Sequence, residues 1–74
     1  MKYNEEKVDE VVLALLYLTL HENVRAWKEH DWDSMNRLHE KGLIENPKSK
    51  VKSVVFTDEG LKEAGRLFKK HFSE

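Results

Sequence analysis

The sequence contains no cysteine, one proline and three glycines. The absence of cysteine excludes a disulfide framework and a thiolate metal site, so neither compensates for a small core. A chain of 74 residues is expected to form one domain over residues 1–74. A domain of this size buries only about 60% of the surface that its unfolded chain exposes. Self-association would therefore add useful stability.

Long hydrophobic runs are also lacking. The longest mainly apolar run, Val11 to Leu20, is too short to span a bilayer as a helix. The first residues, Met-Lys-Tyr-Asn-Glu-Glu, do not show a basic stretch followed by an apolar one and a cleavage site. These features predict a soluble cytoplasmic protein without a membrane partner.

The formal net charge is only −1, which is unlike a strongly basic nucleic-acid binder. The charge is unevenly distributed, however. Residues 46–56 carry Lys48, Lys50 and Lys52 and no acidic residue. The local positive excess therefore falls on one short segment.

The first predicted helix begins after Asn4, a good cap, and runs to about Leu20. Apolar residues cover most of its circumference in the second half, namely Leu13, Leu16, Tyr17 and Leu20. Such a helix either lies at the centre of the domain or forms the seam of a homodimer. Because a short chain has few elements with which to cover a helix, the homodimer is slightly favoured.

The segment after His21-Glu22-Asn23 is predicted to form a short helix over residues 24–29, the bracing helix of a helix-turn-helix. Trp27 and Trp32 flank the turn that follows it. The simpler interpretation is that both indoles close the core. The alternative is an exposed aromatic pair that stacks on a base or a ligand.

A further helix is predicted over residues 33–41, capped by Asp31 or Asp33, with Trp32, Met35 and Leu38 turned inward. It occupies the position of a recognition helix. Major-groove readers use arginine and asparagine on base edges, and serine suits phosphate. The candidate nucleic-acid-binding residues are Ser34, Asn36, Arg37 and Lys41. Since the same face carries several carboxylates, an ordinary solvated surface explains it equally well.

A β-hairpin is predicted next, with Ile44 and residues 54–56 as strands and residues 46–50 as the turn. Lys48, Lys50 and Lys52 then form a basic wing that would contact phosphates. Lysines also protect edge strands from aggregation, and the spacing alone does not separate the two roles. Thr57 is predicted to cap a last helix that runs to about Phe72, in which Gly65 marks a close approach to the first helix.

Catalytic and metal-binding patterns are not found. The four histidines lack the spacing of a zinc site, and no serine, histidine and carboxylate combination exceeds chance. We therefore expect no enzyme activity, no cofactor, no metal and no small-molecule substrate.

Two resemblances add to this reading. A helix ending in Leu-x-x-x-Gly-Leu-Ile, a polar hairpin tip and Thr-x-x-Gly opening a helix resemble the winged helix-turn-helix domains of small bacterial regulators. The whole chain also resembles a small bacterial family known as domain of unknown function number 6429. The segments that carry this resemblance are residues 5–10, 13–21, 25–28, 31–33, 38–44 and 52–55, with Thr57-x-Glu59-Gly60. That family implies a bacterial protein and brings no activity to any residue.

The predicted fold is therefore α+β and mainly α, a winged helix-turn-helix-like domain with three to four helices and a small antiparallel β-hairpin. Two functions follow. The first is a DNA-binding or accessory transcriptional regulator that contacts double-stranded DNA. The alternative is a protein-interaction module that uses the apolar first helix and binds no nucleic acid.

Overall fold

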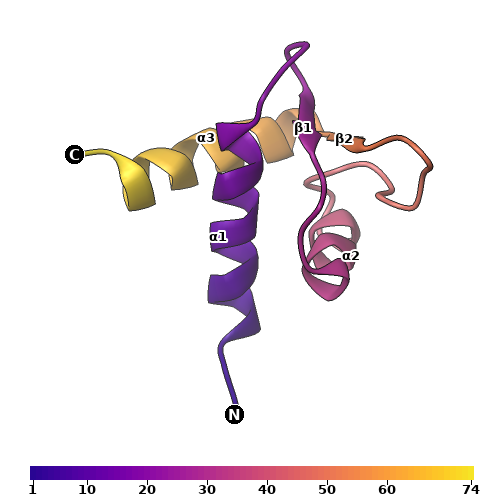
Figure 1. Ribbon diagram of the computed structural model, residues 1–74. Coiled ribbons are helices and arrows are strands. Elements are labelled where there is room, and N and C mark those ends of the chain that lie inside the picture. The colour runs from indigo at the N-terminus through magenta and orange to yellow at the C-terminus, as the bar shows by residue number, and fades with distance from the viewer.

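The computed structural model describes residues 1–74 as three helices and two short strands (Figure 1). In chain order these are α1 (Glu5–Leu18), β1 (Arg25–Trp27), α2 (Trp32–Glu40), β2 (Ser53–Val55) and α3 (Asp58–Phe72). α1 contacts both other helices: α2 lies beside it and α3 runs across it. The predicted class, α+β and mainly helical with a small antiparallel pair of strands, is confirmed.

Each helix begins at a side-chain cap that the sequence predicts. Asn4, Asp31 and Thr57 accept hydrogen bonds from the backbone N–H groups of Lys7, Ser34 and Gly60. These bonds satisfy N–H groups that have no partner inside the helix. After α2, Gly42 has φ +76°, the left-handed conformation that ends a helix and that glycine adopts without strain.

The segment between α1 and α2 differs from the prediction. Residues 24–29 do not form a helix, because Arg25–Trp27 is a strand that pairs antiparallel with β2. Glu22 and Asn23 both have positive φ, and they turn the chain sharply so that His21 and Arg25 exchange backbone hydrogen bonds. Pairing with β2 also buries Ala26 against Val54. This long-range pairing outweighs the weak local helix preference of six residues.

The winged helix-turn-helix pattern is not confirmed. That motif needs two helices joined by a turn of about three or four residues. Here α1 and α2 are separated by β1, and α2 and α3 by β2. Of the predicted hairpin, Ile44 contributes one isolated bridge to Phe56, while the ladder partner of Ser53–Val55 is β1.

One hydrophobic core joins all three helices and the strands. Its members are Val12, Leu13, Ala14, Leu16, Ala26, Met35, Leu38, Ile44, Val54, Phe56, Ala64 and Leu67. Close packing at the start of α3 requires a glycine, because a Cβ on Gly60 would lie 1.6 Å from the carbonyl oxygen of Leu43. Gly65 faces the Tyr17 ring, which confirms the predicted close approach of the two helices. None of the helices combines the length and the apolarity needed to cross a membrane.

Candidate nucleic-acid interface

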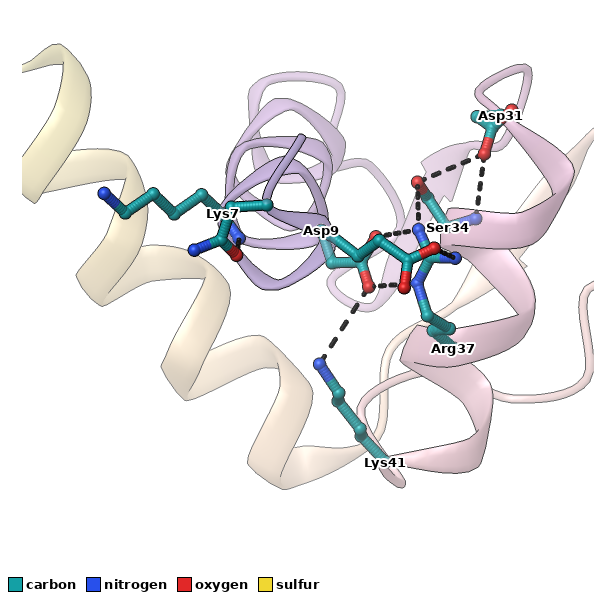
Figure 2. Close-up of polar contacts among 8 residues, drawn as sticks. Lys7, Asp9, Asp31, Ser34, Arg37 and Lys41 are labelled. Carbon is teal, nitrogen blue, oxygen red and sulfur yellow. Dashed lines mark hydrogen bonds and ion pairs between the residues drawn. The ribbon is translucent and has the colours of Figure 1, made fainter. Parts of the chain in front are cut away.

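The side chains on the outer face of α2 are largely engaged with the rest of the chain. Arg37 donates two hydrogen bonds to Asp9 on α1, from Nε at 2.6 Å and from Nη2 at 2.9 Å, and a third to Glu5 from Nη1 at 3.0 Å. Figure 2 shows Arg37 and Lys41 both reaching from the α2 side towards Asp9. A two-pronged guanidinium–carboxylate pair is among the stronger polar contacts in proteins. Arg37 is therefore a structural link between helices.

Asp9 is only 1% exposed although it is charged. Burial raises the pKa of Asp9, but the hydrogen bonds of Arg37 and Ser34 and the charges of Arg37 and Lys41 outweigh this effect, so the pKa is lowered overall. The carboxylate therefore stays ionised and paired at neutral pH. The sequence carries a signal for this buried position, since Asp9 shares a helix face with Val12, Leu13 and Leu16.

Ser34 is fully buried, and its hydroxyl donates to the Asp31 carboxylate at 3.3 Å and accepts from Arg37 at 3.3 Å. Lys41 is exposed, with its Nζ 3.9 Å from Asp9. Only Asn36, of the four residues predicted on this helix, makes no side-chain hydrogen bond or ion pair. Few of the polar side chains predicted on α2 are therefore free to form hydrogen bonds with a base.

The residues predicted for the basic wing, unlike the arginine and the lysine predicted on α2, make no side-chain ion pairs within the chain. Residues 46–52, here called the basic loop, project away from α1 and α3 (Figure 1). Lys48, Lys50 and Lys52 are all exposed on this loop. They are absent from every ion pair in the structure, so their charges face solvent.

The basic loop is held in place by Lys28, which follows β1. Lys28 Nζ donates to the carbonyl oxygens of Pro47 at 2.8 Å and Ser49 at 2.7 Å, and to the Ser49 hydroxyl at 3.1 Å. Pro47 is buried, and the Asn46 side chain accepts from the N–H of Lys48 at 2.9 Å. We call these three hydrogen bonds the Lys28 clamp. The sequence does not predict the clamp, because no local pattern links Lys28 to carbonyl groups about twenty residues later.

Both tryptophans lie beside the basic loop and are exposed. Trp27 is 52% and Trp32 is 57% exposed, so the prediction that the two indoles close the core is wrong. Alternation along β1 explains Trp27, since the strand turns Ala26 inward and its neighbour outward. The core is completed instead by smaller side chains such as Ala26 and Val54.

Two neighbouring hollows lie along this surface. The larger, of about 470 Å³, is lined by residues 28–30 and 49–52 together with Trp32. The smaller, of about 310 Å³, is lined by Trp27, Glu29 and Lys52. Because Glu29 and Lys52 line both hollows, the two hollows adjoin, with Trp32 in the lining of one and Trp27 in that of the other.

The residues predicted for a dimer interface are placed mostly inside the chain. Leu13 and Leu16 are core residues, Tyr17 packs against Phe68 with ring centroids 5.5 Å apart, and Leu20 is half-buried against the core. A folded chain does not present Leu13 or Leu16 to a second copy. The apolar residues that α1 does leave uncovered are Val11 and Leu18, the latter 65% exposed.

Elsewhere, α1 and α3 are joined by polar contacts at their outer edge. Glu10 accepts from Lys70 at 2.9 Å and from His71 at 2.8 Å. The hydrogen bonds from Lys70 and His71 lower the pKa of Glu10 to about 2. No group of three or more histidine, aspartate and glutamate side chains is arranged to hold a metal ion.

Comparison with known proteins identifies the relatives of this chain. It is 52% identical over 73 residues to the "Uncharacterized protein y4hR" of Sinorhizobium fredii (strain NBRC 101917 / NGR234), an alignment that covers 99% of each chain. No solved structure matches the chain significantly. Residues 4–74 match the family model described as "Domain of unknown function (DUF6429)". The resemblance seen in the sequence is thus confirmed, and the chain belongs to this family.

Proposed function

We propose that this chain binds the phosphate backbone of DNA through the basic loop. One observation carries the proposal: three exposed lysines without ion-pair partners stand on a loop whose backbone is clamped by Lys28. A clamped loop loses little conformational entropy when it meets a ligand, so more of the binding free energy is retained. Phosphate neutralisation by such side chains supplies most of the sequence-independent affinity for nucleic acid.

The sequence-based hypothesis assigned base contacts to α2 and phosphate contacts to the loop lysines, and we retain only the phosphate contacts. Arg37 and Ser34 are engaged with Asp9 and Asp31, so base reading by α2 would require breaking intramolecular contacts. We therefore assign the contacts to Lys48, Lys50 and Lys52 and expect weak dependence on DNA sequence.

The test is fluorescence anisotropy of a labelled random-sequence DNA duplex titrated with the protein over a range of salt concentrations. Three phosphate contacts predict a slope of about −2.7 for log K against log salt concentration. Replacing Lys48, Lys50 and Lys52 by glutamate should abolish binding. The matched control replaces Lys2, Lys62 and Lys69, which are exposed and unpaired elsewhere, and changes the net charge equally. Equal affinities of the two triple variants would contradict the assignment to the loop.

A second candidate, self-association through α1, is favoured by a specific pattern. Val8, Val11, Leu15 and Leu18 follow the three-and-four spacing of a coiled-coil seam. Val8 also packs against the core at one end of this stripe. Val11 and Leu18 are exposed, and the other two are half-buried. Two copies could therefore pack α1 against α1, as the predicted homodimer requires, with different residues at the seam.

Sedimentation equilibrium at high protein concentration tests this candidate. A dimer should be present, and Leu18→Glu should convert it to monomer. Val51→Glu, which places the same charge on an exposed apolar residue of the basic loop, should leave the dimer unchanged. A wild-type chain that sediments as a monomer would remove the candidate.

A further inference from the structure

The two exposed tryptophans and the basic loop form one continuous surface. Trp32 shares the larger hollow with Lys50 and Lys52, and Trp27 shares the smaller hollow with Lys52. Exposed indoles and lysines without ion-pair partners thus line the same two adjoining hollows. This is the combination found in grooves that bind single-stranded nucleic acid, where bases stack on aromatic rings and lysines follow the phosphates.

The Trp27 indole is fixed before any ligand arrives. His21 stacks on it, with ring centroids 4.6 Å apart and an interplanar angle of 30°. The His21 ring N–H at Nδ1 donates to the Thr19 carbonyl oxygen at 2.8 Å, and the Trp27 backbone N–H donates to Thr19 Oγ1 at 3.0 Å. A ring held on one face and open on the other can receive a base at a low cost in side-chain entropy.

Base pairing decides which form of nucleic acid can use these rings. In a duplex the faces of the bases are already stacked on one another, and only their edges reach the grooves. An exposed indole therefore finds no free base face on a duplex. On an unpaired strand each base has a free π-face, and stacking is largely independent of sequence.

We infer that the chain prefers single-stranded nucleic acid, with Trp27 and Trp32 stacking on bases while Lys50 and Lys52 contact phosphates. The inference rests on the proposed function, because it uses the same basic loop. It adds the strand state of the ligand and two base-contacting residues. It also assigns a role to Glu29, which lines both hollows and whose negative charge would repel a phosphate backbone bound there.

The experiment compares three labelled probes of equal length by fluorescence anisotropy at one salt concentration: oligo-dT, oligo-U and a mixed-sequence DNA duplex. We expect at least about tenfold tighter binding of one or both single strands than of the duplex, together with quenching of tryptophan fluorescence. Preference for oligo-dT would identify DNA as the ligand, and preference for oligo-U would identify RNA.

Variants separate stacking from charge. Trp27→Ala and Trp32→Ala should each weaken single-strand binding by about 5- to 150-fold and leave duplex binding unchanged. Trp27→Phe should retain most of the affinity, because a phenyl ring still stacks. Phe72→Ala removes an exposed aromatic that lines neither hollow and serves as the control. Glu29→Gln should tighten binding of every probe.

Two outcomes distinguish the inference from the proposed function. Equal binding of duplex and single strands, with both tryptophan-to-alanine variants at wild-type affinity, would overturn the stacking role and leave phosphate binding by the loop intact. Absence of binding to all three probes at low salt would overturn both.

Discussion

Arg37 of α2 holds Asp9 of α1 through two hydrogen bonds of 2.6 and 2.9 Å, and Asp9 is almost entirely buried. The residue that most resembled a DNA-reading arginine in the sequence is thus the partner of a buried carboxylate. Buried ion pairs stabilise a fold weakly as pairs, but the loss of one partner leaves an uncompensated charge in the interior.

This asymmetry predicts a large difference between a single and a double substitution. Arg37→Met should lower the midpoint of urea unfolding strongly, because it leaves Asp9 unpaired. Asp9→Leu combined with Arg37→Met should recover most of the loss, since both charges are then replaced by apolar groups. Arg66→Ala, which removes an exposed pair with Glu63, is the control and should change the midpoint little. A double variant less stable than Arg37→Met would contradict this account.

The Glu10 contact with Lys70 and His71 predicts a loss of stability in acid. The pKa of Glu10 is lowered to about 2 in the folded chain, from an ordinary value of 4.5. A lowered folded-state pKa contributes stability that is complete above the ordinary value and is lost as pH falls from about 4.5 to about 2. Urea midpoints measured across this range should fall more for the wild type than for Glu10→Gln. Parallel curves for the two proteins would show that the contact is not formed.

Gly60 and Gly65 lie in the same helix, but we expect their replacement by alanine to change the unfolding free energy in different ways. Gly60→Ala places a Cβ 1.6 Å from the Leu43 carbonyl oxygen, where backbone must move, and should cost about 1–3 kcal/mol or more of unfolding free energy. Gly65→Ala places a Cβ 3.3 Å from the Tyr17 ring. That side chain can shift slightly, and alanine gains about 1 kcal/mol in helix propensity, so the net change should be small or favourable. Chemical denaturation of both variants measures the change in unfolding free energy. Similar losses at the two sites would contradict the predicted difference between them.

The Lys28 clamp is expected to affect opening of the basic loop but not the stability of the whole domain. Lys28→Met removes three hydrogen bonds to Pro47 and Ser49, so the basic loop should open more often. Trypsin should then cleave after Lys48 and Lys50 faster than in the wild type, while the thermal midpoint changes little. Lys62→Met, on the exposed surface of α3, should leave the loop cleavage rate unchanged. Unaltered cleavage in Lys28→Met would show that other contacts hold the loop.

Local chemistry determined much of this fold. Side-chain caps at Asn4, Asp31 and Thr57 and the left-handed Gly42 set the ends of the helices, because each acts on backbone groups within a few residues. The periodicity of apolar residues likewise predicted that Met35 and Leu38 of α2 turn inward, and both are buried, although Trp32, predicted with them, is exposed. Family membership also followed from the residues themselves.

The tertiary structure decided what local patterns leave open. Whether residues 25–27 form a helix or a strand depended on β2, a partner 28 residues away in the sequence, and that pairing in turn exposed Trp27. The role of Arg37 depended on Asp9, which lies on another helix, and the shape of the basic loop depended on Lys28. Side chains that are chemically suited to DNA are equally suited to a carboxylate or a carbonyl group of the same chain. Only the folded arrangement selects between these partners, because a hydrogen bond requires contact within about 3 Å and the sequence does not specify distance.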